Sequence, residues 1–81
     1  NPFNPETRIK YELSKPTRVV IKITNLLGQQ VRTLIDQDKP AGYFEIFWDG
    51  KDNAGCRVST GVYLYRMEAV DCVQIKKMLL F

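Results

Sequence analysis

The fold of this chain is decided by the stretch YFEIFWDGKDNAG, residues 43–55. Its first half alternates, because Phe44, Ile46 and Trp48 share one face of an extended strand and the residues between them share the other. Its second half is the densest cluster of turn-forming residues in the chain. A half-buried strand that ends in such a turn predicts a small antiparallel β protein.

The same period of two continues on both sides of this stretch. In the last part of the chain the apolar positions change phase around Lys76 and Lys77, which predicts a β-bulge there. A tight turn is expected at Asp71. Further strands are expected over residues 8–13, 18–24, 62–70 and 73–81.

Residues 25–35 allow two interpretations. Their apolar members stand at helical spacing, as in an amphipathic helix: Leu27, Val31, Leu34 and Ile35. Gly28, placed directly after a strand, favours instead a hairpin into a short strand over residues 30–35. We adopt the hairpin, with a polar loop following over residues 36–42.

These signals, spaced about eight to twelve residues apart, predict an all-β fold, a small antiparallel β-sandwich of about seven strands. The 81 residues suffice for one domain, expected at 8–81 behind a Pro-rich arm at 1–7. Pro2 and Pro5 stiffen that arm, which carries Phe3. The expected core is Ile9, Tyr11, Leu13, Val19, Ile21, Ile23, Val31, Leu34, Phe44, Ile46, Trp48, Tyr63, Tyr65, Met67 and Ile75.

Charge and composition exclude several function classes. The 12 Lys and Arg residues exceed the 9 Asp and Glu residues only slightly and are dispersed, so no nucleic-acid partner is expected. No apolar run reaches the length of a transmembrane segment. The chain has no histidine, and we interpret Glu12, Glu45 and Glu68 as solvated strand residues. We therefore expect a non-catalytic protein without a cofactor.

Two further residue sets have alternative explanations. Cys56 and Cys72 fit no metal spacing, and we favour two free thiols over a single disulfide. The oxygens of Asp49, Asp52 and Asn53 form a weak candidate for a calcium site. The spacing fails the EF-hand pattern, however, so we favour Asp and Asn side chains that cap turns.

Exposed aromatic rings are a third possible site. Four rings on neighbouring segments could form a carbohydrate-binding face: Tyr43, Phe47, Tyr63 and Tyr65. The last two share a face with Met67, which favours core positions for them.

Taken in order, these motifs resemble the type A C-terminal sorting domain of type IX (Por-type) secretion cargo. The resemblance spans the whole chain. The residues that carry it are Asn1–Pro5, Thr7–Ile9, Val19–Ile23, Asn25–Val31, Ala41–Tyr43, Trp48–Asp52, Gly55, Gly61–Arg66 and Lys76–Met78. The positions that it implies as structural motif are Pro2, Phe3, Pro5, Gly28, Trp48, Asp49, Gly50, Gly55, Gly61 and Tyr63.

The resemblance implies an Ig-like sandwich that acts as an address label on a secreted or cell-surface protein, exported through the periplasm. Its partners would be an upstream cargo domain in the same polypeptide, the outer-membrane translocon and a sortase-like peptidase. A terminal strand at a sheet edge could pair with such a partner by β-augmentation. The implied partner-binding residues are Lys76, Lys77, Met78, Leu79, Leu80 and Phe81.

Two alternatives use much the same fold. The second half of the chain also resembles the Ig-like domain of flagellar hook-capping proteins, through Trp48-Asp49-Gly50 and Gly61-Val62-Tyr63. That resemblance implies a structural assembly domain. The other alternative is a carbohydrate-binding or spacer module of a secreted enzyme.

Overall fold

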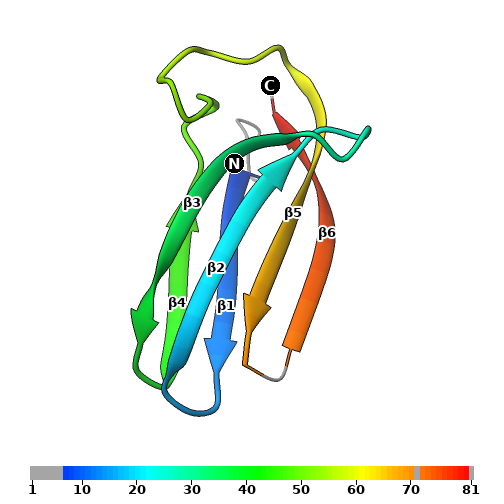
Figure 1. Ribbon diagram of the computed structural model, residues 1–81. Helices are drawn as coiled ribbons and strands as arrows, with labels where there is room; N and C mark the ends of the chain where they lie inside the picture. The colour runs from blue at the N-terminus through cyan, green and yellow to red at the C-terminus, as the bar shows by residue number, and fades with distance from the viewer. Residues whose placement is uncertain (1–6, 71, 81) are drawn as a thin grey trace.

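The computed structural model describes residues 7–70 and 72–80, which form six strands (Figure 1). The arm residues Pro2, Phe3 and Pro5, the expected turn at Asp71 and the terminal Phe81 lie outside the described residues. The strands are β1 (Arg8–Leu13), β2 (Thr17–Thr24), β3 (Gln30–Lys39), β4 (Gly42–Phe47), β5 (Gly61–Ala69) and β6 (Cys72–Leu80).

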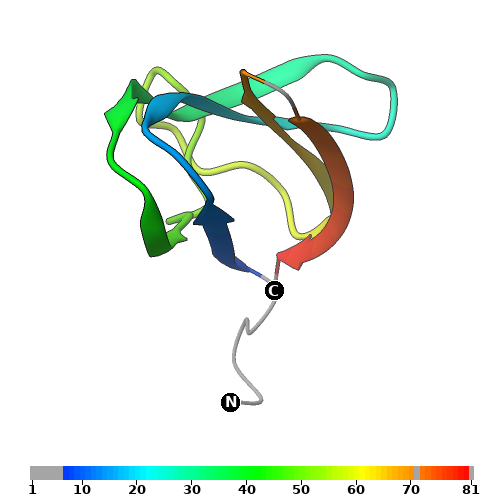
Figure 2. The ribbon, with the colours of Figure 1, turned by 90° about the horizontal axis from the view of Figure 1, so that it is seen from below.

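The strands form two antiparallel sheets that face each other (Figures 1 and 2). One sheet pairs β1 with β4, and the other has the order β3-β2-β5-β6. Between β4 and β5 runs a long connection with an isolated bridge from Lys51 to Arg57. The all-β antiparallel sandwich is therefore confirmed, with six strands where about seven were expected.

The core lies between the sheets and follows the alternation of the sequence. Apolar residues of β1 and β2 are buried at every second position, and Trp48 is 3% exposed. The buried hydrophobic residues are Ile9, Tyr11, Leu13, Val19, Ile21, Ile23, Ile35, Trp48, Tyr63, Met67 and Met78. The other expected core residues, Val31, Leu34, Phe44, Ile46 and Tyr65, are partly buried against them. Ile75 is the exception, since its side chain is 57% exposed.

The hairpin interpretation of residues 25–35 is confirmed, because β2 pairs with β3. Asn25 closes the turn: its Oδ1 accepts hydrogen bonds from the backbone N–H groups of Leu27 (2.9 Å) and Gln29 (3.0 Å). Gly28 adopts φ of +84° in this turn. Local polar contacts of the kind that an Asn-x-x-Gly sequence favours thus close the hairpin.

The expected polar loop over residues 36–42 is wrong. β3 continues to Lys39, and its polar residues pair with β2. The Arg18 guanidinium lies 2.6 Å from Asp36 Oδ1 and 4.0 Å from Asp38 Oδ1. An edge strand with solvated side chains needs no apolar alternation, so backbone pairing with β2 can hold a segment that composition alone assigns to a loop.

The expected β-bulge in the last strand is also wrong. β6 pairs with β5 without a register shift, from Gly61 opposite Leu80 to Ala69 opposite Cys72. The register irregularities occur instead between β2 and β3. The change of apolar phase in β6 has another cause: its first half carries apolar side chains on the outer face, and its second half carries them toward the core.

Candidate functional site

The connection after β4 is organised around Trp48. The indole packs edge-on against Tyr63, with ring centroids 5.1 Å apart. Its Nε1–H donates a hydrogen bond to the backbone carbonyl of Lys51 at 3.0 Å. Tyr63 donates its own hydroxyl proton to the carbonyl of Ser59 at 2.6 Å. Both polar ends of this aromatic pair are therefore satisfied by the connection that leads to β5.

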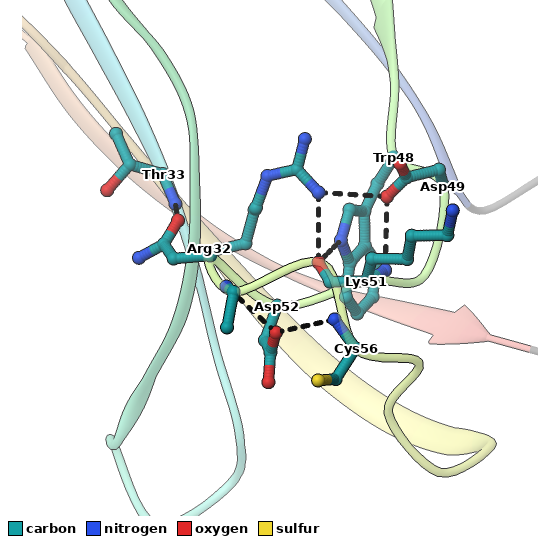
Figure 3. Close-up of polar contacts among 9 residues, drawn as sticks. Arg32, Thr33, Trp48, Asp49, Lys51, Asp52 and Cys56 are labelled. Atoms are coloured by element: carbon teal, nitrogen blue, oxygen red, sulfur yellow. Dashed lines mark hydrogen bonds and ion pairs between the residues drawn. The ribbon is translucent and has the colours of Figure 1, made fainter.

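Arg32, from β3, joins the same turn (Figure 3). Its Nη1 donates to Asp49 Oδ1 at 2.9 Å and to the Lys51 carbonyl at 3.0 Å. The Lys51 backbone N–H donates to Asp49 Oδ1 at 3.0 Å. Burial raises the pKa of Asp49, but the Lys51 N–H and the Arg32 charge outweigh it and hold the pKa below its ordinary value.

The lowered pKa of Asp49 gives a testable pH dependence. A carboxyl with a depressed folded pKa stabilises the fold above its unfolded pKa of about 3.9, and this contribution is lost as pH falls through the folded value. We therefore expect Asp49→Asn to flatten the loss of stability below about pH 4. Urea unfolding of the wild type and of Asp49→Asn between neutral and acidic pH measures this pH dependence. If the free energy of unfolding falls in parallel for the two proteins, the pKa of Asp49 is not lowered by folding.

The other members of the candidate calcium cluster also serve the backbone (Figure 3). Asp52 Oδ1 accepts hydrogen bonds from the N–H groups of Ala54 (3.0 Å) and Cys56 (2.9 Å). Asn53 Oδ1 accepts one from the N–H of Thr33 in β3 at 3.0 Å. Asp49 and Asp52 thus cap N–H groups of their own turn, as the turn interpretation expects, whereas Asn53 reaches across to β3.

Gly50 links this turn to the last strand. It is buried, with φ of +78°, and a Cβ added there would lie 3.2 and 3.3 Å from the two Cδ atoms of Leu80. Its carbonyl accepts a hydrogen bond from the N–H of Val58 at 3.0 Å. The turn that follows Trp48 therefore fits closely against the end of β6.

β6 stands at the end of the four-stranded sheet, and no strand in the described part of the chain pairs with its outer edge (Figure 2). Met78 faces the core and is 1% exposed, whereas Val73 and Ile75 are 55% and 57% exposed. Lys76 and Lys77 are exposed and take part in none of the ion pairs found among residues 7–70 and 72–80. The strand thus offers an open backbone edge with apolar and basic side chains.

The structure divides the residues that the sequence suggested for partner binding. Lys76 and Lys77 lie at the surface, and Leu79 is half-buried. Met78 is buried in the core, so only its backbone is accessible to a partner strand. Leu80 packs against the core as well. The sequence analysis did not include Val73 and Ile75 among the partner-binding residues. Their odd-numbered positions, which lie on the opposite face of the strand from Met78, could have indicated that they are exposed.

Cys56 and Cys72 are both free and exposed, as favoured. The described residues contain no helix of the length and apolarity needed to cross a membrane.

A second surface lies on the outer face of the two-stranded sheet. Tyr43 is 83% and Phe47 is 63% exposed, whereas Tyr63 is buried and Tyr65 is half-buried. A shallow hollow of about 540 Å³ adjoins Tyr43 and is also lined by Lys10, Tyr11, Glu12, Phe44 and Glu45. A carbohydrate face would therefore rest on two rings rather than on the four that the sequence offered.

Comparison with known proteins places this geometry among Ig-like domains. A family model described as "FlgD Ig-like domain" matches residues 3–71. The fold is similar to FlgD from P. aeruginosa, with a TM-score of 0.71 and 22% identity over 91% of this chain and 60% of that one. Our chain thus spans less than two thirds of that protein. A search of curated proteins gives no match.

Two solved structures from Porphyromonas gingivalis share the fold. The dimeric latent PorU gives a TM-score of 0.68 and 20% identity over 98% of this chain and 8% of that one. PorZ is described as an essential bacterial surface component of the type IX secretion system. It gives a TM-score of 0.51 and 22% identity over 78% of this chain and 8% of that one. At these identities the likeness establishes the fold.

Proposed function

This chain belongs to the FlgD Ig-like domain family, and from that premise we propose that it is a non-catalytic sorting domain for type IX secretion. It would direct a larger cargo protein across the outer membrane to the cell surface or the medium. The observation that carries the proposal is β6, an edge strand with exposed apolar and basic side chains. Such an edge is suited to pairing with a partner strand.

One further observation supports this function. The sequence motifs, from Asn1-Pro2-Phe3-Asn4-Pro5 to Lys76-Lys77, resemble the type IX sorting pattern in order. The likeness to PorU and PorZ is compatible with it at the level of the fold.

In the proposed mechanism the sandwich acts by binding alone. Its core and the Trp48 turn hold β6 in a fixed position, and the outer-membrane translocon recognises that strand after export of the cargo to the periplasm. A sortase-like peptidase then cleaves upstream of the domain. No step requires a catalytic residue, a metal or a cofactor of this chain.

A reporter fusion tests the proposed function. Residues 1–81 are joined to the C-terminus of a periplasmically exported fluorescent protein in a host with a working type IX system. We expect most of the reporter at the surface or in the medium, and all of it in the periplasm of a matched host that lacks the translocon. A reporter that stays periplasmic with an intact domain in the competent host would refute the proposal.

A structural assembly role is the second candidate, and the family match itself favours it. In that case the domain would hold neighbouring subunits rather than address a cargo. The reporter assay separates the two, because an assembly domain gives the same periplasmic reporter in both hosts.

A further inference from the structure

We propose that the partner of β6 is an extended strand with adjacent carboxylates, which pairs with the open edge opposite Lys76 and Lys77. This inference rests on the proposed function and specifies the chemistry of the partner. The two edge strands of the four-stranded sheet, β3 and β6, differ in how their charged side chains are paired.

On the β3 side three of the four charged side chains have ion-pair partners within the chain, and the fourth, Lys39, lies over the Phe44 ring. Arg18 pairs with Asp36 and Asp38, and Arg32 pairs with Asp49. Another strand that approached this edge would have to compete with existing ion pairs. The charged side chains of the β3 edge are therefore less available to an approaching strand than those of the β6 edge.

On the β6 side the lysine charges have no ion-pair partner among the described residues. Lys76 and Lys77 are consecutive, so their side chains point to opposite faces of the sheet, and both are exposed. Glu68, on the neighbouring β5, lies 2.6 Å from Arg66 and is thereby engaged. The β6 edge thus presents positive charge on both faces and no acid of its own.

The apolar residues of β6 argue against a purely protective role for the lysines. A lysine on an edge strand often serves to prevent pairing with other chains. Here Val73 and Ile75 lie exposed on the same strand, 55% and 57%, and offer β-branched surface to a neighbour. Lysines beside an exposed apolar surface favour a partner strand of opposite charge, whereas lysines without such a surface would only repel other strands.

A second copy of the chain is a poor occupant of this edge. Antiparallel pairing of two β6 strands would bring lysine pairs toward one another, and like charges at opposed positions destabilise a ladder. An acidic strand has the complementary charge. The occupant is therefore a segment with two adjacent carboxylates and β-branched neighbours that cover Val73 and Ile75.

Two capped peptides test this inference, each nine residues long to match β6. One consists of Val and Thr around a central Glu-Glu pair, and the other has Lys-Lys in its place. Titration of the ¹⁵N-labelled domain should shift the amide signals of β6 with the acidic peptide, which should bind roughly fivefold more tightly than the basic one. The difference should shrink as the ionic strength rises toward about 1 M.

The double variant Lys76→Glu/Lys77→Glu should reverse the preference, while Lys10→Glu/Arg57→Glu, with the same change of net charge at other exposed positions, should keep it. Lysines that only guard the edge predict equal binding of both peptides or of neither, and either result overturns the inference.

The reporter fusion separates this inference from the proposed function. If the wild-type domain exports the reporter and Lys76→Glu/Lys77→Glu exports it equally well, the acidic partner is refuted and the sorting function stands. If the wild-type domain fails to export, the sorting function is refuted, whatever the peptides show.

Discussion

Trp48→Ala is expected to remove a large part of the stability of this domain. Truncation of a buried Trp costs about 3–5 kcal/mol, and a domain of this size has only about 4–12 kcal/mol in total. The indole is 3% exposed, packs against Tyr63 and holds the Lys51 carbonyl. Its loss therefore opens the core and loosens the turn at the same time.

Urea unfolding followed by far-UV circular dichroism measures this effect. Trp48→Phe keeps a ring but lacks the N–H donor, so it should cost much less than the alanine variant. Tyr43→Ala, on a side chain that is 83% exposed in the adjoining strand, should change stability by no more than about 0.5 kcal/mol. If Trp48→Ala were as mild as Tyr43→Ala, the indole would not be the centre of the fold.

Gly50→Ala is expected to be the second most damaging of the proposed changes. An alanine at φ of +78° costs about 1–2 kcal/mol for its left-handed backbone alone. Its Cβ would also press against Leu80 at 3.2 Å, so either Leu80 or the turn has to move. The end of β6 should therefore be displaced as well as destabilised.

The chain offers a matched control for this effect. Gly55 has φ of +85°, and a Cβ added there would meet nothing within 4 Å. Gly55→Ala thus carries the same backbone strain without the contact, and it should destabilise less than Gly50→Ala. The excess should disappear in a Leu80→Ala background. Equal effects of the two alanines would show that the turn does not position β6.

Much of the fold can be predicted from the sequence, because buried and exposed residues alternate along a half-buried strand. A strand with one dry face must alternate, and Ile9, Tyr11, Leu13 and the matching residues of β2 do so without exception. The turn at Asp49–Gly55 is equally local, since its Asp side chains bond N–H groups that are only two to four residues away. Patterns of this kind are complete within a short segment, so the order of residues is enough to predict them.

The features that the sequence did not predict depend on distant partners. The hydrogen bond from Arg32 to Asp49 joins residues that are 17 positions apart, and no local sequence pattern predicts it. The polar half of β3 is held by pairing with β2 rather than by burial. In β6, the alternation places Val73 and Ile75 on one face, but it does not say which face of the sheet is covered, and both side chains are exposed.

If β6 is the strand that the secretion machinery recognises, export requires its exposed side chains, and a comparison of two variants of the reporter fusion tests this. Val73→Ser/Ile75→Ser and Tyr43→Ser/Phe47→Ser each remove two exposed apolar side chains, from β6 and from the opposite sheet. We predict that the β6 pair leaves the reporter in the periplasm while the β4 pair exports it at the wild-type level. Normal export of the reporter by the β6 variant, with the domain folded, would show that β6 is not the recognised strand.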